Sequence, residues 1–419
     1  MYRICNKNKR FVKYTTWLLA NNFNCPIFAT SLKQTQIMKS VYFDSAATTR
    51  VRPEVIKTMQ DVLEHQYGNP SSTHAFGRAS KSIIETTRKT IAKELHASPQ
   101  EIIFTSGGTE ADNMILRCAV RDANVTTIIT SPIEHHAVLH TVEELRNEYD
   151  VTVEYVKLQA CGTPDYDDLE RLLTANDERK LVSLMHVNNE VGNILDIDKV
   201  SSLCKANNAL LHSDTVQSIG HYKWNVEETP IDFMTAAAHK FHGPKGVGFA
   251  YIKKNNTLKP LIFGGSQERG FRAGTEPVHN IKGLETAFVL AYENLDKEKH
   301  YVEALKDYFK SEITKAIPGV KFNGNCSDNT KSTYTLLNVC LPMSAEKALT
   351  LQFQLDLKGI ACSKGSACQS GSGKGSHVLE HILSEEDQQK PSIRFSFCKY
   401  NTKDEVDYVV GVLKEFVEK

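Results

Sequence analysis

Three groups with complementary chemistry follow short apolar segments that are typical of buried strands. Lys240 follows "IDFMTAAA", Asp214 ends "ALLHSD", and the segment "SGGTEADN" (106–113) follows "EIIFT". A lysine at the end of a buried strand is unusual, and burial lowers the pKa of its amine enough for attack on a carbonyl. By itself, a lysine that extends to the surface is the simpler interpretation.

The segment 106–113 combines a tight glycine turn with a hydroxyl side chain at an expected helix start. Free N–H groups and the helix dipole favour phosphate at such a place. An ordinary strand-to-helix turn capped by Thr109 explains the same pattern. Asp214 is equally ambiguous, because its carboxylate could pair with a protonated ring nitrogen or cap the next helix.

Together the three groups are more specific than any one of them. Pyridoxal phosphate requires a lysine for its aldehyde, an acid for its ring nitrogen and an anion site for its phosphate. Ligands of an open α/β sheet bind at the carboxyl ends of its strands, where all three groups are expected. Asn189 in "HVNNEVG" and His135 in "IEHHAV" also follow expected strands and could contact the ring. The sequence therefore predicts a pyridoxal phosphate enzyme.

The elements that must position these residues alternate between apolar strands and helical segments over residues 101–252. This alternation predicts an α/β fold with a mostly parallel sheet flanked by helices. A long helical stretch, roughly 280–317, then leads into shorter strands and a final helix. We expect a large cofactor-binding domain (41–279), whose first residues could pack on the second domain, and a smaller α+β domain (280–419).

Composition narrows the class of protein. The chain has 419 residues, of which 41% are hydrophobic and 24% charged, and its formal net charge is zero. No global charge therefore argues for binding to nucleic acid or an anionic membrane, and no apolar run reaches the roughly 18 residues of a membrane span. The ten cysteines include no C-x-x-C pair, which favours reduced thiols in a reducing compartment, and no structural metal site is expected.

The first 40 residues hold seven Lys or Arg and no Asp or Glu. A basic, acid-free leader could be a transit peptide, which would place the protein in the mitochondrial matrix. Alternatively, residues 1–40 are an upstream extension without a targeting role, because "MKSVYFDSAATT" from Met38 runs directly into an expected strand. The leader is poor in Arg and Ser, so we favour the extension and a cytoplasmic protein.

One cysteine, Cys368, lies among small residues in "KGSACQSGSGKG" (364–375). Nothing there has the bulk to pack in a core, and glycine and serine permit large excursions of the chain. Long connections of this kind inside compact domains are usually functional. A surface thiol without a role is the alternative, whereas a phosphate-binding Walker motif is excluded by the spacing.

From about Val41 to the C-terminus, the sequence resembles the cysteine desulfurases, in the class-V branch of the fold-type-I pyridoxal phosphate enzymes. That fold implies a seven-stranded sheet in the large domain. The resemblance rests on motifs that occur in the family's order and spacing: "YFDSAATT", "YGNPSSTHAFGR", "FTSGGTEADN", "EHHAVL", "MHVNNEVG", "HSDTVQS", "AHKFHGPKG", "ERGFRAGTEPVHNI", "GSACQSGS" and "SIRFSF".

The resemblance implies a role for each candidate. Lys240 would hold the cofactor covalently, Asp214 would keep its ring nitrogen protonated, and His135 would stack on the ring. Asn189 and Gln217 would meet the ring hydroxyl and the carboxylate region. The phosphate would be served by Gly108, Thr109 and His239.

Two further residues complete the implied site. Arg394 in "SIRFSF" would clamp the substrate carboxylate, a task that suits its planar fork. Thr275 in "RAGT" would reach the phosphate in a partner subunit, which implies a homodimer.

The implied reaction removes sulfur from L-cysteine and leaves L-alanine and a persulfide on Cys368. Lys240 would move the α-proton, and His135 is the candidate for the thiol proton. The sulfur would pass to an acceptor protein for iron–sulfur cluster assembly or tRNA thiolation, and Cys368 could transiently ligate an iron–sulfur cluster. The alternatives are a selenocysteine lyase, another class-V activity such as an aminotransferase, or a non-catalytic sulfur carrier on the same fold.

Three residues depart from the family pattern. Ala237 stands where a serine usually contacts the phosphate, and Thr235 or Ser266 could compensate for it. Gln267 stands where histidine is common, and Gln369 follows the cysteine where threonine is common.

The acceptor is less well specified than the reaction. The chain ends without the tail that housekeeping members use to dock a scaffold, whereas the length of the loop 362–377 matches the group that transfers sulfur to several acceptors.

Overall fold

The computed structural model describes residues 40–365 and 375–418, and the compact unit to which they belong spans Ser40–Lys419. Within this described part, no helix is both long and apolar enough to cross a membrane. The cysteines of the described segments are free thiols.

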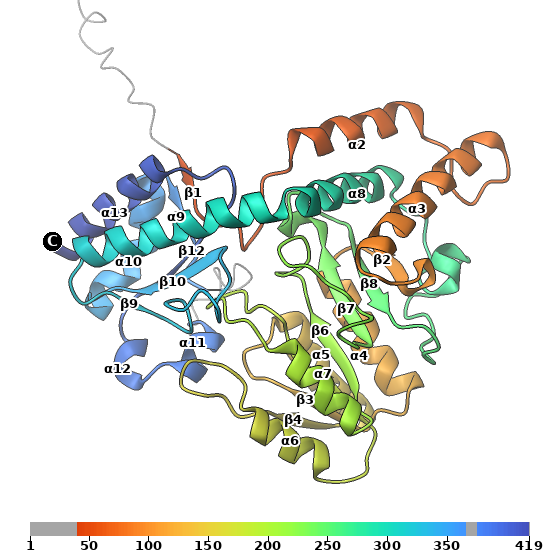
Figure 1. Cartoon of the computed structure of the whole chain (residues 1–419), viewed down its shortest axis with the longest axis horizontal. Helices are drawn as coiled ribbons and strands as arrows, with labels where there is room; N and C mark the ends of the chain where they lie inside the picture. The colour runs from red at the N-terminus through yellow and green to blue at the C-terminus, as the bar shows by residue number, and fades with distance from the viewer. Residues whose placement is uncertain (1–39, 366–374, 419) are drawn as a thin grey trace, which may run out of the picture. The chain divides into compact units, whose positions relative to one another are not determined.

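A seven-stranded sheet forms the centre of the larger part of this unit (Figure 1), as the sequence predicted. Its spatial order is β2-β8-β7-β6-β5-β3-β4, and β8 runs antiparallel to both of its neighbours while the other pairs are parallel. Consequently β2 runs in the same direction as β6 and β7, and their carboxyl ends share one edge. The strands are β2 (Ile102–Thr105), β3 (Thr127–Thr130), β4 (Thr152–Tyr155), β5 (Lys180–Ser183), β6 (Leu210–Asp214), β7 (Phe233–Ala237) and β8 (Gly248–Ile252).

Both faces of the sheet are covered by helices, because alternate strand residues point to opposite sides. Ile103 and Leu181 pack towards α4 and α5, whereas Phe104 and Val182 pack into the core that includes α3 and α8. The helices that flank the sheet are α2 (Pro53–His65), α3 (Ala75–Glu94), α4 (Gly108–Asp122), α5 (His136–Tyr149), α6 (Tyr166–Thr174), α7 (Ile197–Ala206) and α8 (Val278–Glu293).

The C-terminal part contains a second core around a three-stranded antiparallel sheet, in the order β12-β10-β9. The expected helical stretch 280–317 consists of two helices, because the helical conformation is interrupted at Asn294. The side chain of Asn294 donates to the carbonyl of Leu290. The elements of this part are α9 (Leu295–Ala316), β9 (Lys321–Phe322), β10 (Leu336–Cys340), α10 (Ala345–Leu357), β11 (Ile360–Ala361), α11 (His377–Ile382), α12 (Glu385–Gln388), β12 (Ser392–Ser396) and α13 (Lys403–Glu418).

The first described strand, β1 (Val41–Tyr42), joins this C-terminal part, where it pairs in parallel with β11. Phe43 is fully buried there, in edge contacts with the rings of Phe309 and Phe397. The chain then continues from residue 43 towards the edge of the large sheet, so one short segment contacts both cores.

Candidate active site

A cavity of about 190 Å³ opens at the carboxyl ends of β6 and β7. Residues from both cores line it, since Ala46 and Ala47 follow β1 and Arg394 lies on β12. The predicted site residues that line this cavity are Gly108, Thr109, His135, Asn189, Asp214, Gln217, His239, Lys240 and Arg394.

Lys240 lies immediately after β7, at the end of the short 3₁₀ helix η2 (Ala238–Lys240). Its Nζ donates to the carbonyl oxygens of Ala46, at 2.5 Å, and Ala47, at 3.1 Å. The side chain amide of Gln217 donates to the Ala46 carbonyl as well, at 3.0 Å. These contacts hold the amine inside the cavity, and the alternative of a lysine that extends to the surface is wrong.

Asp214 ends β6 and is 7% exposed. One of its oxygens accepts the backbone N–H of Val216 at 2.9 Å, so it also stabilises a turn. Burial, with the nearby charge of Asp112, raises the pKa of Asp214 to about 6. A cationic ring N–H placed against this carboxylate would favour its charged form, because the positive charge replaces the solvation by water that burial removes.

Asp112, on the first turns of α4, is a site residue that the sequence analysis missed, although it lies in the quoted motif "FTSGGTEADN". It lines the cavity, is 1% exposed, and burial raises its pKa to about 7. His212 lies behind it, with Nε2 3.4 Å from Asp112 Oδ1 and Nδ1 2.9 Å from Ser183 Oγ. Two carboxyl groups therefore share the floor of the cavity.

The expected anion site is the N-terminus of α4, which begins at Gly108 directly after β2. Gly107 occupies the cap position at φ +153°, so Thr109 lies inside the first turn and its predicted role as a helix cap is wrong. The turn also requires a glycine on the neighbouring strand β8, at Gly248. A Cβ on Gly248 would lie 2.9 Å from Gly107 Cα and 2.1 Å from the carbonyl oxygen of Ala236. Gly108 and Thr109 of this first turn line the cavity, and the first N–H groups of a helix have no partner within the helix, which suits an anion.

His239 is the side chain beside this anion site. Its Nδ1 lies 3.2 Å from Thr48 Oγ1, and burial, reinforced by the charges of Lys240 and Lys245, lowers its pKa to about 4. It is therefore a neutral imidazole that can donate one hydrogen bond.

Ala237 lines the cavity without a hydroxyl group to offer. Neither Thr235 nor Ser266, the two residues that could compensate, is among the described residues that line it.

His135 is the N-cap of α5, where its Nδ1 accepts the backbone N–H of Ala137 at 3.1 Å. Burial lowers its pKa, opposed by the charge of Asp214 and assisted by that of Lys240. A neutral ring that accepts through Nδ1 carries its proton on Nε2. His135 is thus set up to donate a hydrogen bond, and it can accept a proton at Nε2 only when the cap contact is given up.

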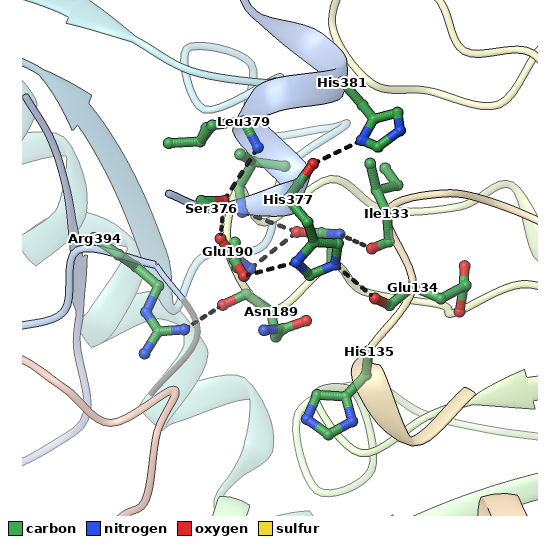
Figure 2. Close-up of polar contacts among 12 residues, drawn as sticks. Ile133, Glu134, His135, Asn189, Glu190, Ser376, His377, Leu379, His381 and Arg394 are labelled. Carbon is green, nitrogen blue, oxygen red and sulfur yellow. Dashed lines mark hydrogen bonds and ion pairs between the residues drawn. The ribbon is translucent and has the colours of Figure 1, made fainter. Parts of the chain in front are cut away.

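Arg394 is 1% exposed and is held from two sides. It donates to Asp44 Oδ1 at 2.9 Å. Figure 2 shows its second contact, with the carbonyl oxygen of Asn189, at 2.7 Å. The backbone of Ser363 pairs with that of Arg394, and the hydroxyl of Ser363 donates to the same Asp44 oxygen. Arg394 Nε is buried without a hydrogen-bond partner among the described residues, which is the state expected of a group that awaits a carboxylate.

Two predicted residues are not among the described residues that line this cavity. Thr275 lines a separate hollow of about 380 Å³ with residues 66–70 and the end of α2. Cys368, together with Gln369, falls in the segment 366–374, outside the described residues. Among the residues that are described, no group of three or more His, Cys, Asp or Glu side chains is arranged to hold a metal ion.

Comparison with known proteins gives one consistent result. The sequence profile of the aminotransferase class-V family matches residues 41–409. The chain is 42% identical over 387 residues to "Cysteine desulfurase IscS" of Dictyoglomus turgidum, covering 91% of this chain and 95% of that protein. It is 40% identical over 373 residues to "Putative cysteine desulfurase IscS 1" of Bacillus subtilis, covering 88% and 96% respectively.

Solved structures agree with these relatives. A "NIFS-like protein" matches with a TM-score of 0.82 at 38% identity, covering 91% of this chain and all of that one. "SspA in complex with cysteine" matches with a TM-score of 0.74 at 30% identity, covering 87% of this chain and all of that one.

Proposed function

The chain belongs to the aminotransferase class-V family and, within it, to the cysteine desulfurases; on that premise we propose that it transfers sulfur from L-cysteine to its own Cys368. L-alanine is the carbon product. The observation that carries the proposal is the gathering of an amine, a buried carboxyl, a helix N-terminus and a buried arginine around one cavity.

The donor set fits pyridoxal phosphate group by group. Lys240 would hold the aldehyde carbon, Asp214 the ring nitrogen, and the first turn of α4 with His239 the phosphate. His135 and Gln217 line the same cavity and would contact the ring and its hydroxyl. When bound, the cofactor withdraws electrons from the substrate's α-carbon, which is chemistry that protein side chains lack.

Arg394 would bind the substrate carboxylate. Its Nη atoms are held by Asp44 and the Asn189 carbonyl, so the guanidinium is fixed before substrate arrives. The buried Nε supplies a further donor. The solved relative that binds cysteine supports this choice of substrate class.

Two residues of the chain would then move protons and sulfur. Lys240, oriented by two backbone carbonyls, carries the α-proton away from the substrate. The thiolate of Cys368 attacks the substrate sulfur: an S–S bond forms, the carbon–sulfur bond breaks, and its electron pair stays with the carbon product, which takes a proton and leaves as alanine. His135 donates a hydrogen bond from Nε2 at this stage.

Further parts of the proposal concern partners. Leu63 and Tyr67 are 58% and 72% exposed and line the hollow that contains Thr275. An exposed apolar surface at this place supports a homodimer in which Thr275 reaches the other subunit's phosphate site. We also propose that the persulfide passes to an iron–sulfur scaffold or a tRNA-thiolation protein, in the cytoplasm.

The test is release of sulfide and alanine from L-cysteine with a reductant. We expect equimolar products from the wild type and almost none from Cys368→Ala. Cys161→Ala is the matched control, because Cys161 is a partly exposed thiol remote in sequence from the cavity residues. Equal sulfide release by wild type and Cys368→Ala would overturn the role of Cys368 and favour a lyase.

A further inference from the structure

Described residues on both sides of the segment 366–374 lie close to one buried carboxylate. Glu190 directly follows Asn189 and is fully buried. At the end of the segment, Ser376 Oγ donates to Glu190 Oε2 (Figure 2). At its start, a Cβ on Gly365 would lie 3.4 Å from the same oxygen and 3.2 Å from Ser376 Cβ. Gly365 and Ser376, which flank the part of the chain that carries Cys368, therefore both lie beside Glu190.

A histidine adds a second contact at the return point. Ser376 caps α11 by accepting the N–H of Leu379 at 3.1 Å, and His377 is the first residue of that helix. His377 Nε2 lies 3.0 Å from the carbonyl oxygen of Glu134, the residue before His135 (Figure 2). His377 thus connects α11 to the segment that contains Glu134 and His135.

The contact with the Glu134 carbonyl determines which ring nitrogen of His377 carries a proton. A carbonyl oxygen only accepts, so Nε2 must carry a proton. Nδ1 then faces Glu190 Oε1 at 4.0 Å, and both atoms are buried without a hydrogen-bond partner among the described residues. In a neutral ring two lone pairs would face each other there. A proton on Nδ1 converts this repulsion into a buried, charge-assisted contact.

We propose that protonated His377 and Glu190 form an ion pair that fixes the return of the Cys368-bearing segment beside Asn189 and Glu134. His377 and Glu190 are positioning residues, because they act through the placement of Cys368. Loss of the proton from His377 removes the attraction between its ring and Glu190, whereas the contacts of Ser376 with Glu190 and of His377 Nε2 with the Glu134 carbonyl remain. The positioning role rests on the proposed function of Cys368, whereas the ion pair itself does not.

Other titratable groups face His377 from the elements around it. The ring of His136 lies 4.5 Å away, tilted by 39°, and would repel a charged His377 if it were protonated. The pKa of His135 is lowered by burial first, and the charge of His377 contributes to the same direction. On α11 itself, His381 Nδ1 contacts the His377 carbonyl at 2.7 Å, and Glu380 is exposed. Among the described carboxylates, Glu190 is the one that lies within ion-pair distance of His377, at 4.0 Å.

The direct test is amide hydrogen exchange of residues 376–382 in the full-length holoenzyme, between about pH 6 and pH 9, corrected for the intrinsic rate; this range brackets histidine titration. We expect protection of the wild type to fall as the pH rises. His377→Gln should lack this protection at every pH. Its amides should exchange about tenfold faster than the protected amides of the wild type, which corresponds to about 1.4 kcal/mol. Glu190→Gln should keep it at high pH, because an amide N–H can donate to the unprotonated Nδ1.

His381→Gln is the matched control, since it removes a histidine from the exposed side of the same helix. It should follow the wild type at every pH. Exchange that is independent of pH in the wild type would overturn the ion pair without requiring any variant to be stable. A loss of protection in His381→Gln equal to that in His377→Gln would overturn it as well.

The positioning role is tested separately by desulfuration kinetics. We expect His377→Gln to lower kcat, with the KM for L-cysteine and the absorption spectrum of the bound cofactor unchanged. A normal kcat in a variant that has lost protection of 376–382 would refute the positioning role. Sulfide release by Cys368→Ala would instead refute the proposed function, whatever the exchange experiment shows.

Discussion

Arg394→Lys is the most direct perturbation of the proposed substrate clamp. Arginine is held by charge-assisted hydrogen bonds to Asp44, at 2.9 Å, and to the Asn189 carbonyl, at 2.7 Å. Lysine keeps the positive charge but has a single ammonium on a flexible stem, so it cannot keep these anchors and also bind a carboxylate through two donors.

The expected loss is one charge-assisted hydrogen bond to the substrate. Such a bond contributes about 1.5–3 kcal/mol, which predicts a fall of kcat/KM for L-cysteine of roughly 10- to 150-fold. Most of the change should be in KM, because the clamp binds a carboxylate that does not react.

The assay is alanine formation at several L-cysteine concentrations, with cofactor content measured by absorbance. Arg117→Lys is the control: Arg117 pairs with Glu148 on the surface of α4, away from the cavity lining. An unchanged kcat/KM in an Arg394→Lys protein that retains its cofactor would refute the clamp, as would an equal loss in the control.

Three further predictions concern the cavity floor and the anion site. Burial raises the pKa of Asp112 to about 7 and that of Asp214 to about 6. Both carboxyl groups therefore ionise more easily in the unfolded chain, so the free energy of unfolding of the cofactor-free protein should fall as the pH rises from about 4 to about 7. Asp112→Asn should reduce the difference in Tm between about pH 5 and pH 8; an unchanged difference would show that Asp112 is ionised without cost. Asp214→Asn should release the cofactor at least about tenfold more readily in dialysis, because a neutral amide cannot compensate a ring N–H cation. Ala237→Ser should hold the cofactor more tightly, by about 1 kcal/mol or roughly fivefold in Kd, since it adds one hydroxyl donor at the cavity; equal or weaker binding would place the phosphate elsewhere.

Local patterns in the sequence were sufficient to predict the sheet and the ends of its strands. Alternating apolar strands and helices gave the parallel sheet, and Lys240 and Asp214 fall where their strands end. The cavity residues that lie in motifs directly after a strand were predicted by the same reasoning, because the carboxyl ends of parallel strands meet at one edge of the sheet.

Contacts between distant segments were not predictable in this way. Asp44 lies in a quoted motif, yet nothing local indicates that it holds Arg394, 350 residues later in the sequence. Glu190 and His377 are similar, because their pairing depends on how α11 packs. The break at Asn294 and the position of Thr109 inside the first turn of α4 depend on backbone geometry that periodicity does not resolve.

The pairing of β1 with β11 has a consequence for biosynthesis. Residues 41–47 leave the ribosome early, whereas Ile360 and Arg394, which β1 and Asp44 contact, are made about 320 to 350 residues later. At about 5–20 residues per second, this interval lasts roughly 15–70 s, during which the large sheet can already fold. The amine of Lys240 acquires its two carbonyl partners only when the N-terminal segment is placed. A nascent or truncated chain would therefore lack the substrate clamp, and activity would begin only after the last strand is complete.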